Sequence, residues 1–226
     1  CDEFARDARQ LITVRHDRAA SAEAYFSTHA EDWDRLRALH YPDHAIEAAL
    51  LKAAGPGPFT RVIDMGTGTG RMLSIFAPHT QEAEGIDMSH QMLTVARANL
   101  TNARVRQGDV AATPFTTASA DLVIIHQVLH YLEAPEHVIA EAARILRPGG
   151  QLLVVDFAPH GLEFLRTEQG HRRLGIRADA MQRWAGVAGL NLSAPLVFDA
   201  PDDCEQGLTV HIWSAIRPAI SEEAAA

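Results

Sequence analysis

Short apolar runs alternate with amphipathic stretches over most of this chain. Apolar runs bounded by turn residues are typical of strands, and apolar residues repeated three or four positions apart are typical of helices. The expected strands are 61–64, 84–87, 104–107, 120–125, 151–156, 193–198 and 208–215. The expected helices between them are 70–76, 89–99, 136–146 and 178–186. This alternation predicts an α/β fold with a mostly parallel, doubly wound sheet and helices on both faces.

The first 44 residues follow a different pattern and are predicted to form a helical segment. Their aromatic residues Tyr25, Phe26 and Trp33 recur at roughly helical spacing. We expect this segment to act as a linker, or as a lid in which Tyr25 and Phe26 close over a ligand. Simple hydrophobic packing of the helix against the domain is the alternative.

The main domain is expected at 45–217, followed by an alanine-rich, flexible tail at 218–226. Its first helix should span 45–54. The sequence GPGPF at 55–59 ends that helix, because proline and glycine interrupt the helical hydrogen-bond ladder.

A glycine-rich turn follows the first expected strand. In RVIDMGTGTGRML (61–73), Asp64 ends the strand, and Gly66, Gly68 and Gly70 precede the next helix. Glycines let the backbone turn sharply and approach a ligand, and the amides at the start of the helix face that ligand. Because ligands of such sheets bind at the carboxyl ends of the strands, this turn is the expected binding site.

The spacing of the glycines separates two classes of cofactor. A dinucleotide site has the pattern G-x-G-x-x-G, but the third glycine here comes one residue early and Arg71 stands in its place. A nicotinamide-dependent dehydrogenase is therefore the weaker alternative.

The acidic residue Asp64, the G-x-G-x-G spacing and a second acidic residue, Asp87, at the end of the second strand resemble class I S-adenosylmethionine (SAM) dependent methyltransferases. Further segments match that family in its order and at similar spacing. They are EGIDMSHQMLTVARANL (84–100), VRQGDVAATPF (105–115), ADLVIIHQVLHYL (120–132) and RILRPGGQLLVVDF (144–157). The resemblance covers 61–157 and implies a Rossmann-like sheet of seven strands with SAM as cofactor and S-adenosylhomocysteine (SAH) as product.

The flanking segments AYFSTHAEDWDRLRALHYP (24–42) and DFAPHGLEFLRTEQGHRRLGI (156–176) resemble a narrower group. They are similar to the methyltransferase half of bacterial proteins that carry an ArsR-type winged-helix DNA-binding domain in front. That resemblance implies that residues 1–20 are a linker from such a domain, which would account for a chain that begins at Cys1.

The resemblance also implies a set of cofactor contacts. Asp87 should accept hydrogen bonds from the ribose hydroxyls, while Asp64 and the glycine turn should hold the amino-acid end of the cofactor. The full set is Tyr25, Asp64, Gly66, Thr67, Gly68, Gly70, Asp87, Met88, Met92, Asp109, Val110, His126 and Gln127. Alternatives stay open for two of them: Asp87 could be a surface acid before the helix cap Ser89, and Met92 could be a core residue.

Methyl transfer from a sulfonium needs positioning more than a nucleophile of the protein. This agrees with a sequence that has no G-x-S-x-G elbow and no cysteine near the pocket. Asp156, His130 and His160 are the catalytic candidates, as general bases for an oxygen or nitrogen acceptor. His171 and Arg172 follow in the segment expected to form the acceptor pocket.

The chain has 12 histidines, which raises the question of a metal. His126 and His130 are four residues apart on an expected helix, as in H-E-x-x-H zinc sites, but Gln127 replaces the glutamate and no third ligand is near. No metal site is therefore expected. Arsenite as substrate is also disfavoured, because the thiolates that bind it are missing.

Composition limits the remaining possibilities. With 226 residues, a net charge of −9 and two cysteines, the chain is expected to be a cytoplasmic protein that does not itself bind nucleic acid or membranes. The N-terminal aromatic residues could serve a homodimer interface. The predicted function is methyl transfer from SAM to an unidentified small molecule, with a module that senses SAM or SAH as the alternative.

Overall fold

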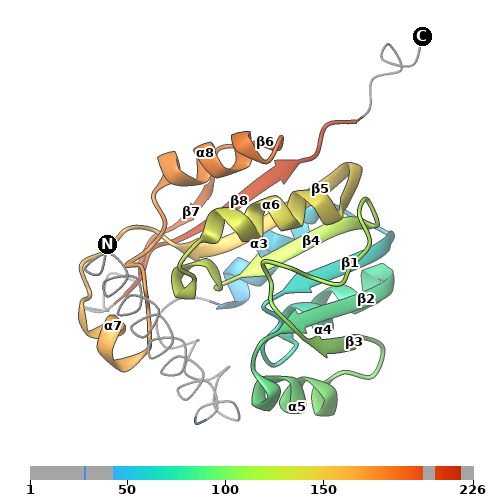
Figure 1. The fold of residues 1–226 in the computed structure, drawn as a ribbon, viewed down its shortest axis with the longest axis horizontal. Coiled ribbons are helices and arrows are strands. Elements are labelled where there is room, and N and C mark those ends of the chain that lie inside the picture. The colour runs from blue at the N-terminus through green and yellow to red at the C-terminus, as the bar shows by residue number, and fades with distance from the viewer. Residues whose placement is uncertain (1–27, 29–42, 201–206, 220–226) are drawn as a thin grey trace, which may run out of the picture.

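The expected strands and helices are present in the computed structural model, which describes residue 28 and residues 43–200 and 207–219 (Figure 1). The helices are α3 (Asp43–Ala54), α4 (Arg71–Phe76), α5 (His90–Asn99), α6 (Pro135–Ile145), α7 (Phe164–Glu168) and α8 (Ala178–Val187), with 3-10 turns η1 (Ala77–His79) and η2 (Leu129–Tyr131). The strands are β1 (Phe59–Met65), β2 (Thr80–Asp87), β3 (Arg104–Gln107), β4 (Ala120–His126), β5 (Leu146–Phe157), β6 (Asn191–Leu192), β7 (Leu196–Phe198) and β8 (Val210–Ile216). The expected segment at 1–44, with Tyr25, and the expected tail at 218–226 lie almost wholly outside the described residues.

The strands form one doubly wound sheet in the order β3-β2-β1-β4-β5-β8-β6, with β7 also paired to β8. Strands β1 to β5 are parallel, and β8 runs antiparallel to β5. The Rossmann-like, mostly parallel fold is thus confirmed. The strand expected at 193–198 is replaced by β6 and β7, because Pro195 between them has no amide to donate to a sheet.

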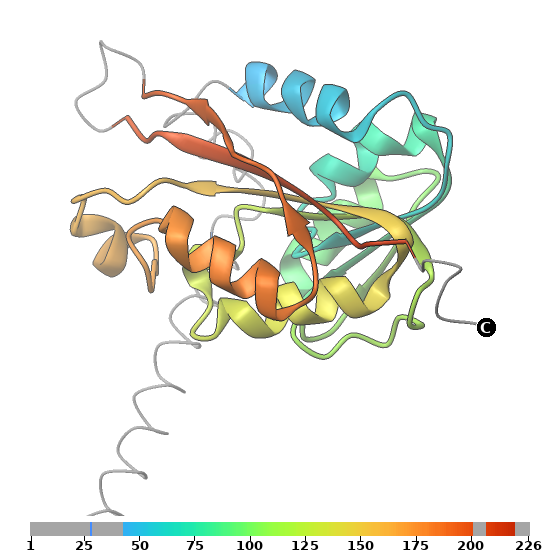
Figure 2. The ribbon, with the colours of Figure 1, turned by 90° about the horizontal axis from the view of Figure 1, so that it is seen from above.

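Helices cover both faces of this sheet (Figures 1 and 2). Helices α3 and α4 lie on one face, and α6 and α8 lie on the other. All residues of β4 are buried, and they alternate between the two cores: Val123 and Ile125 pack with α6, whereas Leu122 and Ile124 pack with α3. A strand covered on both faces is typically apolar along its length, as Leu122, Val123, Ile124 and Ile125 of β4 are.

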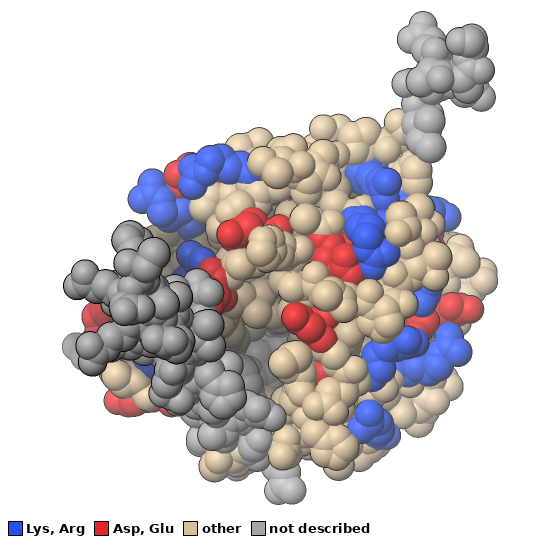
Figure 3. Space-filling model, in the orientation of Figure 1, with Lys and Arg blue, Asp and Glu red and all other residues tan. Residues whose placement is uncertain are grey.

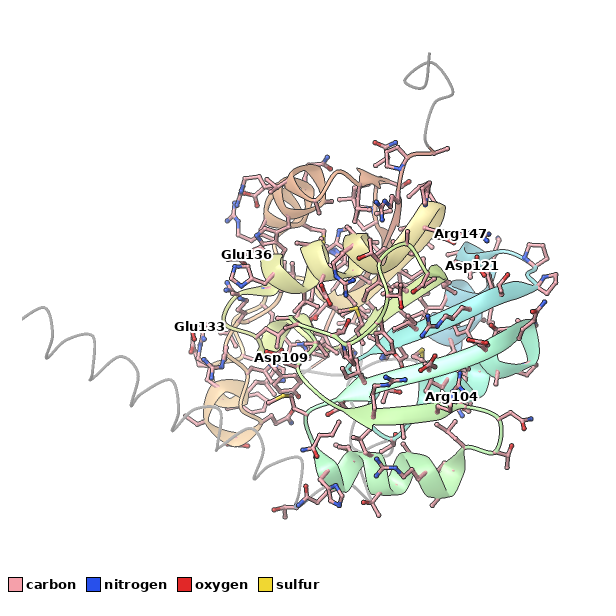
Figure 4. All side chains as sticks on the ribbon, turned by 45° about the vertical axis from the view of Figure 1, so that its right-hand side comes forward. Arg104, Asp109, Asp121, Glu133, Glu136 and Arg147 are labelled. Carbon is pink, nitrogen blue, oxygen red and sulfur yellow. The ribbon has the colours of Figure 1, made fainter. Side chains whose placement is uncertain are left out.

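The carboxyl ends of the parallel strands lie on the side of the molecule where α7 is found (Figures 1 and 2). Figure 4 shows Asp109 and Glu133 toward this end, and Asp121 and Arg147 at the opposite one. At the opposite end, Arg147 binds Asp121 at 2.6 Å. The same carboxylate accepts hydrogen bonds from the amides of Thr60 and Arg61, near the start of β1. Asp121 is therefore committed to holding strands together.

Basic side chains on the face of α6 and α8 form separate clusters, several beside acidic ones (Figure 3). At the start of α8, for example, Arg177 and Arg183 bind the two oxygens of Asp179 at 2.8 and 2.7 Å.

Within the described residues, no helix combines the length and the hydrophobicity that crossing a bilayer requires.

A buried carboxylate joins the three strands at one edge of the sheet. Glu84 of β2 binds Arg61 of β1 at 2.7 Å and Arg106 of β3 at 2.5 Å, and its side chain is 3% exposed. Burial alone would raise the pKa of Glu84, but the hydrogen bonds and charges of the two arginines outweigh it and lower that pKa below its ordinary 4.5.

Glu84→Gln is expected to lower the free energy of unfolding at neutral pH by about 1 to 3 kcal/mol, because it leaves two partly buried guanidinium groups without their carboxylate. A carboxylate with a lowered pKa stabilises the fold above its unfolded-state pKa and loses this effect as the pH falls through the folded value. The difference between variant and wild type should therefore shrink as the pH falls below about 4.5. Urea unfolding across this range measures it.

The matched control for this experiment is Glu82→Gln on the same strand, where the carboxylate is 53% exposed. Equal stability of the two variants, or a difference independent of pH, would contradict the role given to Glu84.

Candidate functional site

The glycine turn between β1 and α4 has the geometry expected from its sequence. Gly66, Gly68 and Gly70 all have positive φ, at 81°, 53° and 84°. The amides of Gly66 and Thr67 donate to the carbonyl of Ile86 at 2.8 and 3.0 Å, which ties the turn to the end of β2.

Two of these glycines are needed for packing, and one faces open space. A Cβ on Gly66 would overlap Cγ2 of Val128 and come within 3.0 Å of its Cγ1, and a Cβ on Gly70 would lie 2.7 Å from Leu100, which directly follows α5. Around Gly68 no atom of the described residues lies within 4 Å of the place a Cβ would take. The backbone at Gly68 is thus the part of the turn that a ligand can approach closely.

Asp64 before this turn and Thr67 within it are both buried. Asp64, near the end of β1, is 1% exposed, and Thr67 is 6% exposed. The side chain of Thr67 packs against Gly85 of β2, where an added Cβ would be 2.7 Å away. The backbone of Thr67, rather than its side chain, is therefore in a position to contact a ligand.

Asp87 links the turn to the following helix. Its Oδ2 accepts the amide of Gly68 at 2.8 Å, and its Oδ1 accepts the amide of Ser89 at 2.9 Å. Ser89 in turn caps α5 through the amide of Met92, as predicted. Burial raises the pKa of Asp87, and the hydrogen bonds from the backbone amides only partly offset this. Each oxygen retains a lone pair, so the carboxylate can still accept hydrogen bonds from a sugar diol.

The segment after β3 joins the same edge. The amide of Gly108 donates to the carbonyl of Asp87 at 3.0 Å, which places Asp109 and Val110 next to the end of β2. Asp109 is exposed and accepts the amide of Ala111 at 2.8 Å, whereas Val110 is buried.

The two methionines proposed for the adenine differ in exposure. Met88 is 62% exposed and follows Asp87 directly, so it is free to cover a flat ring. Met92 is 2% exposed in the inner face of α5, a position that favours core packing.

The segment after β4 corrects one sequence prediction. His126 is the last residue of β4, Gln127 has a positive φ of 58°, and only then does η2 begin. His126 and His130 therefore do not share a helix face, since the left-handed residue between them interrupts any helix. Within the described residues, no three His, Cys, Asp or Glu side chains are grouped so as to hold a metal ion.

The segment is nevertheless close to the glycine turn. The amide of Gln127 donates to Val155 of β5 at 2.7 Å, and Val128 packs on Gly66. His126 and Gln127 are both 7% exposed. The structure thus brings the predicted residues after β4 to the same edge as the turn.

Two of the three catalytic candidates form a buried pair. Nδ1 of His130 lies 2.8 Å from Oδ1 of Asp156, and the two side chains are 1% and 0% exposed. The carboxylate also accepts the amides of Leu129, His130 and Phe157, at 2.9, 3.3 and 2.8 Å. Asp156 therefore holds the turn after β4 against the end of β5.

The third candidate, His160, lies beside this pair. Its ring centroid is 6.2 Å from Phe157 and 6.5 Å from His171, and the His171 ring is 4.3 Å from His130. Burial lowers the pKa of His160, and the nearby His130 lowers it further. His160 also accepts the amide of Leu162 on Nδ1, at 3.3 Å.

Sequence reasoning did not single out Val128 or Gly108. Both act through contacts with residues distant in the chain, Gly66 and Asp87 respectively, and neither has a side chain with recognisable chemistry. Their one local signal is position: Gly108 directly follows the predicted end of β3, and Val128 comes three residues after the predicted end of β4.

Several known proteins with similar sequences or structures are methyltransferases. Residues 63–154 match a family described as a methyltransferase domain. The uncharacterized methyltransferase YcgJ of Bacillus subtilis is 32% identical over 189 residues, which are 72% of this chain and 75% of that protein. The matches to several further curated relatives cover only 45 to 53% of those proteins.

Solved structures share the fold. An S-adenosylmethionine dependent methyltransferase from Mesorhizobium loti has a TM-score of 0.64 and 20% identity, covering 77% of this chain and 99% of that one. A geranyl diphosphate C-methyltransferase from Streptomyces coelicolor, in complex with Mg²⁺, geranyl diphosphate and S-adenosyl-L-homocysteine, has a TM-score of 0.66 and 14% identity, covering 77% and 80%.

Proposed function

Because this chain belongs to the class I SAM-dependent methyltransferases, we propose that it transfers the methyl group of SAM to a small molecule at the carboxyl edge of β1, β2, β4 and β5. The observation that carries the location is the contact between Asp87 and Gly68, which sets an acceptor-only carboxylate beside open backbone. Asp87 holds the ribose, and the Gly66–Gly70 turn holds the amino-acid end. When bound, SAM supplies an activated methyl group on a sulfonium.

The remaining predicted contacts extend this proposal. Asp109 and Val110, placed beside Asp87 by Gly108, border the adenine, and the exposed Met88 covers it. His126 and Gln127 bound the pocket on the side of β4. The space for the methyl acceptor then lies toward the ends of β4 and β5.

Mass spectrometry with SAM that carries a deuterated methyl group tests the function. Incubated with a bacterial small-molecule extract, the protein should produce SAH and transfer the labelled methyl group to a compound of low mass. Label that appears only in added protein or nucleic acid would refute a small-molecule acceptor.

A regulatory use of the same pocket is the second candidate, and the two flanking segments favour it. In this proposal the chain is the methyltransferase half of a cytoplasmic transcription regulator, and occupancy by SAM or SAH sets the DNA affinity of a preceding winged helix. Bound SAM that is never converted to SAH would favour this sensor. In a protein that carries such a domain, operator affinity independent of both ligands would exclude it.

A further inference from the structure

The hydrogen bond between His130 and Asp156 determines which ring nitrogen carries a proton. Three backbone amides donate to the carboxylate of Asp156, so its two oxygens act as hydrogen-bond acceptors in this site. Nδ1 of His130 must then carry the proton that it shares at 2.8 Å. In a neutral ring with its proton on Nδ1, the lone pair lies on Nε2, which is the arrangement of a general base.

Nε2 of His130 is buried and has no hydrogen-bond partner among the described residues. Leaving a buried polar atom unsatisfied costs about 1 to 3 kcal/mol. Tyr131 and Phe157 pack against the ring of His130. If this residue only stabilised the fold, an apolar side chain would therefore be more favourable here than histidine. The missing hydrogen bond to Nε2 therefore indicates a ligand that binds there and dissociates.

The pair lies next to the cofactor turn. Val128, which packs on Gly66, is two residues from His130, and Asp156 is the penultimate residue of β5. The amides of Arg172 and Arg173 donate to the carbonyl of His130 at 2.9 and 3.0 Å, so the segment after β5 covers the turn that holds the ring. This cover keeps bulk water from competing for Nε2.

The neighbouring histidines are less suited to the role. His160 uses Nδ1 to accept the amide of Leu162, and within the described residues its ring forms no ion pair with a carboxylate. Within the described part of the chain, the structure shows His130 with both a buried carboxylate partner and an Nε2 that has no hydrogen bond.

We propose that His130 is the general base of the methyl transfer, with Asp156 as its positioning residue, and that the acceptor carries a weakly acidic O–H or N–H group. The proposal rests on the proposed function. As the acceptor's oxygen or nitrogen forms its bond to the methyl carbon and the carbon–sulfur bond breaks, its proton passes to Nε2. The positive charge of the sulfonium thus ends on the His130 imidazolium, beside Asp156, and water or buffer later removes the proton.

His130→Asn tests the proposal, because the amide of asparagine takes the place of Nδ1 and keeps the donor to Asp156, while nothing replaces Nε2. The probes are phenol, catechol and imidazole, which carry a transferable proton, and dimethyl sulfide, which does not. Wild type should methylate at least one of the first three, and His130→Asn should lower that turnover by about 10²- to 10⁴-fold. The affinity for SAH should not change. His137→Gln, on the exposed side of α6, is the control and should match wild type.

Nitrogen NMR of the histidine rings in the SAH complex gives a readout that does not depend on turnover. His130 should show the Nδ1–H tautomer, adding phenol or imidazole should shift its Nε2 resonance, and Asp156→Asn should populate the opposite tautomer. Equal turnover by wild type and His130→Asn, methylation of dimethyl sulfide alone, or an Nε2 resonance that no probe shifts would each overturn the proposal. Failure of wild type to bind SAH would instead refute the proposed function.

Discussion

Asp87→Ala is expected to weaken the binding of SAH by at least about 100-fold. Hydrogen bonds to a charged acceptor contribute about 1.5 to 3 kcal/mol each, and the ribose presents two hydroxyls to this carboxylate. The variant also frees the amide of Gly68 from its 2.8 Å hydrogen bond, so the turn loses one of its links to the end of β2. Isothermal titration calorimetry with SAH measures the change.

Two further variants make this result specific. Asp87→Asn keeps the size of the side chain and one acceptor oxygen, so its affinity for SAH should lie between that of Asp87→Ala and that of wild type. Asp179→Ala removes an exposed aspartate of α8 that binds only arginines in its own neighbourhood, and it should bind SAH as wild type does. If Asp87→Ala, shown to be folded by its thermal transition, bound SAH as Asp179→Ala does, Asp87 would not contact the cofactor.

Gly66→Ala is expected to lower the free energy of unfolding by about 2 to 5 kcal/mol. A positive φ costs a residue with a Cβ about 1 to 2 kcal/mol, and overpacking against Val128 adds about 1 to 3 kcal/mol. Gly149→Ala is the matched control, because its φ of 79° is close to the 81° of Gly66 but nothing lies within 4 Å of the added Cβ. Gly149→Ala should therefore lose only the free energy that the positive φ costs. Urea unfolding of both variants gives the comparison.

The contact itself is tested by a second substitution. Val128→Ala should recover part of the stability that Gly66→Ala loses, because it removes the methyl groups that the new Cβ would meet. Equal losses for Gly66→Ala and Gly149→Ala, or no recovery on shortening Val128, would contradict the close packing of the two segments.

The features that could be predicted from the sequence are those that one segment specifies by itself. The run of apolar residues in β4, the cap Ser89 before α5 and the positive φ of the three glycines each follow from local chemistry. Asp87 could be placed at the carboxyl edge because parallel strands end together there.

What could not be predicted depends on contacts between distant segments. No local pattern indicates that Val128 fills the space over Gly66. Nor does one indicate that Asp156 forms a hydrogen bond with His130, which is 26 residues away in the sequence. The helix expected after β4 was placed too early, because the left-handed backbone at Gln127 is stabilised by its amide bond to Val155 rather than by its own sequence. Periodicity shows which residues are buried, but not which partners they meet.

The central claim is that the turn Gly66–Gly70 and the carboxylate of Asp87 together bind SAM. A crystal structure of the SAH complex tests it most directly. The account predicts both ribose hydroxyls within hydrogen-bond distance of Asp87 and the amino-acid end against the backbone of Gly68. A nucleoside bound elsewhere on the protein, or a ribose held by another residue with Asp87 facing solvent, would contradict it.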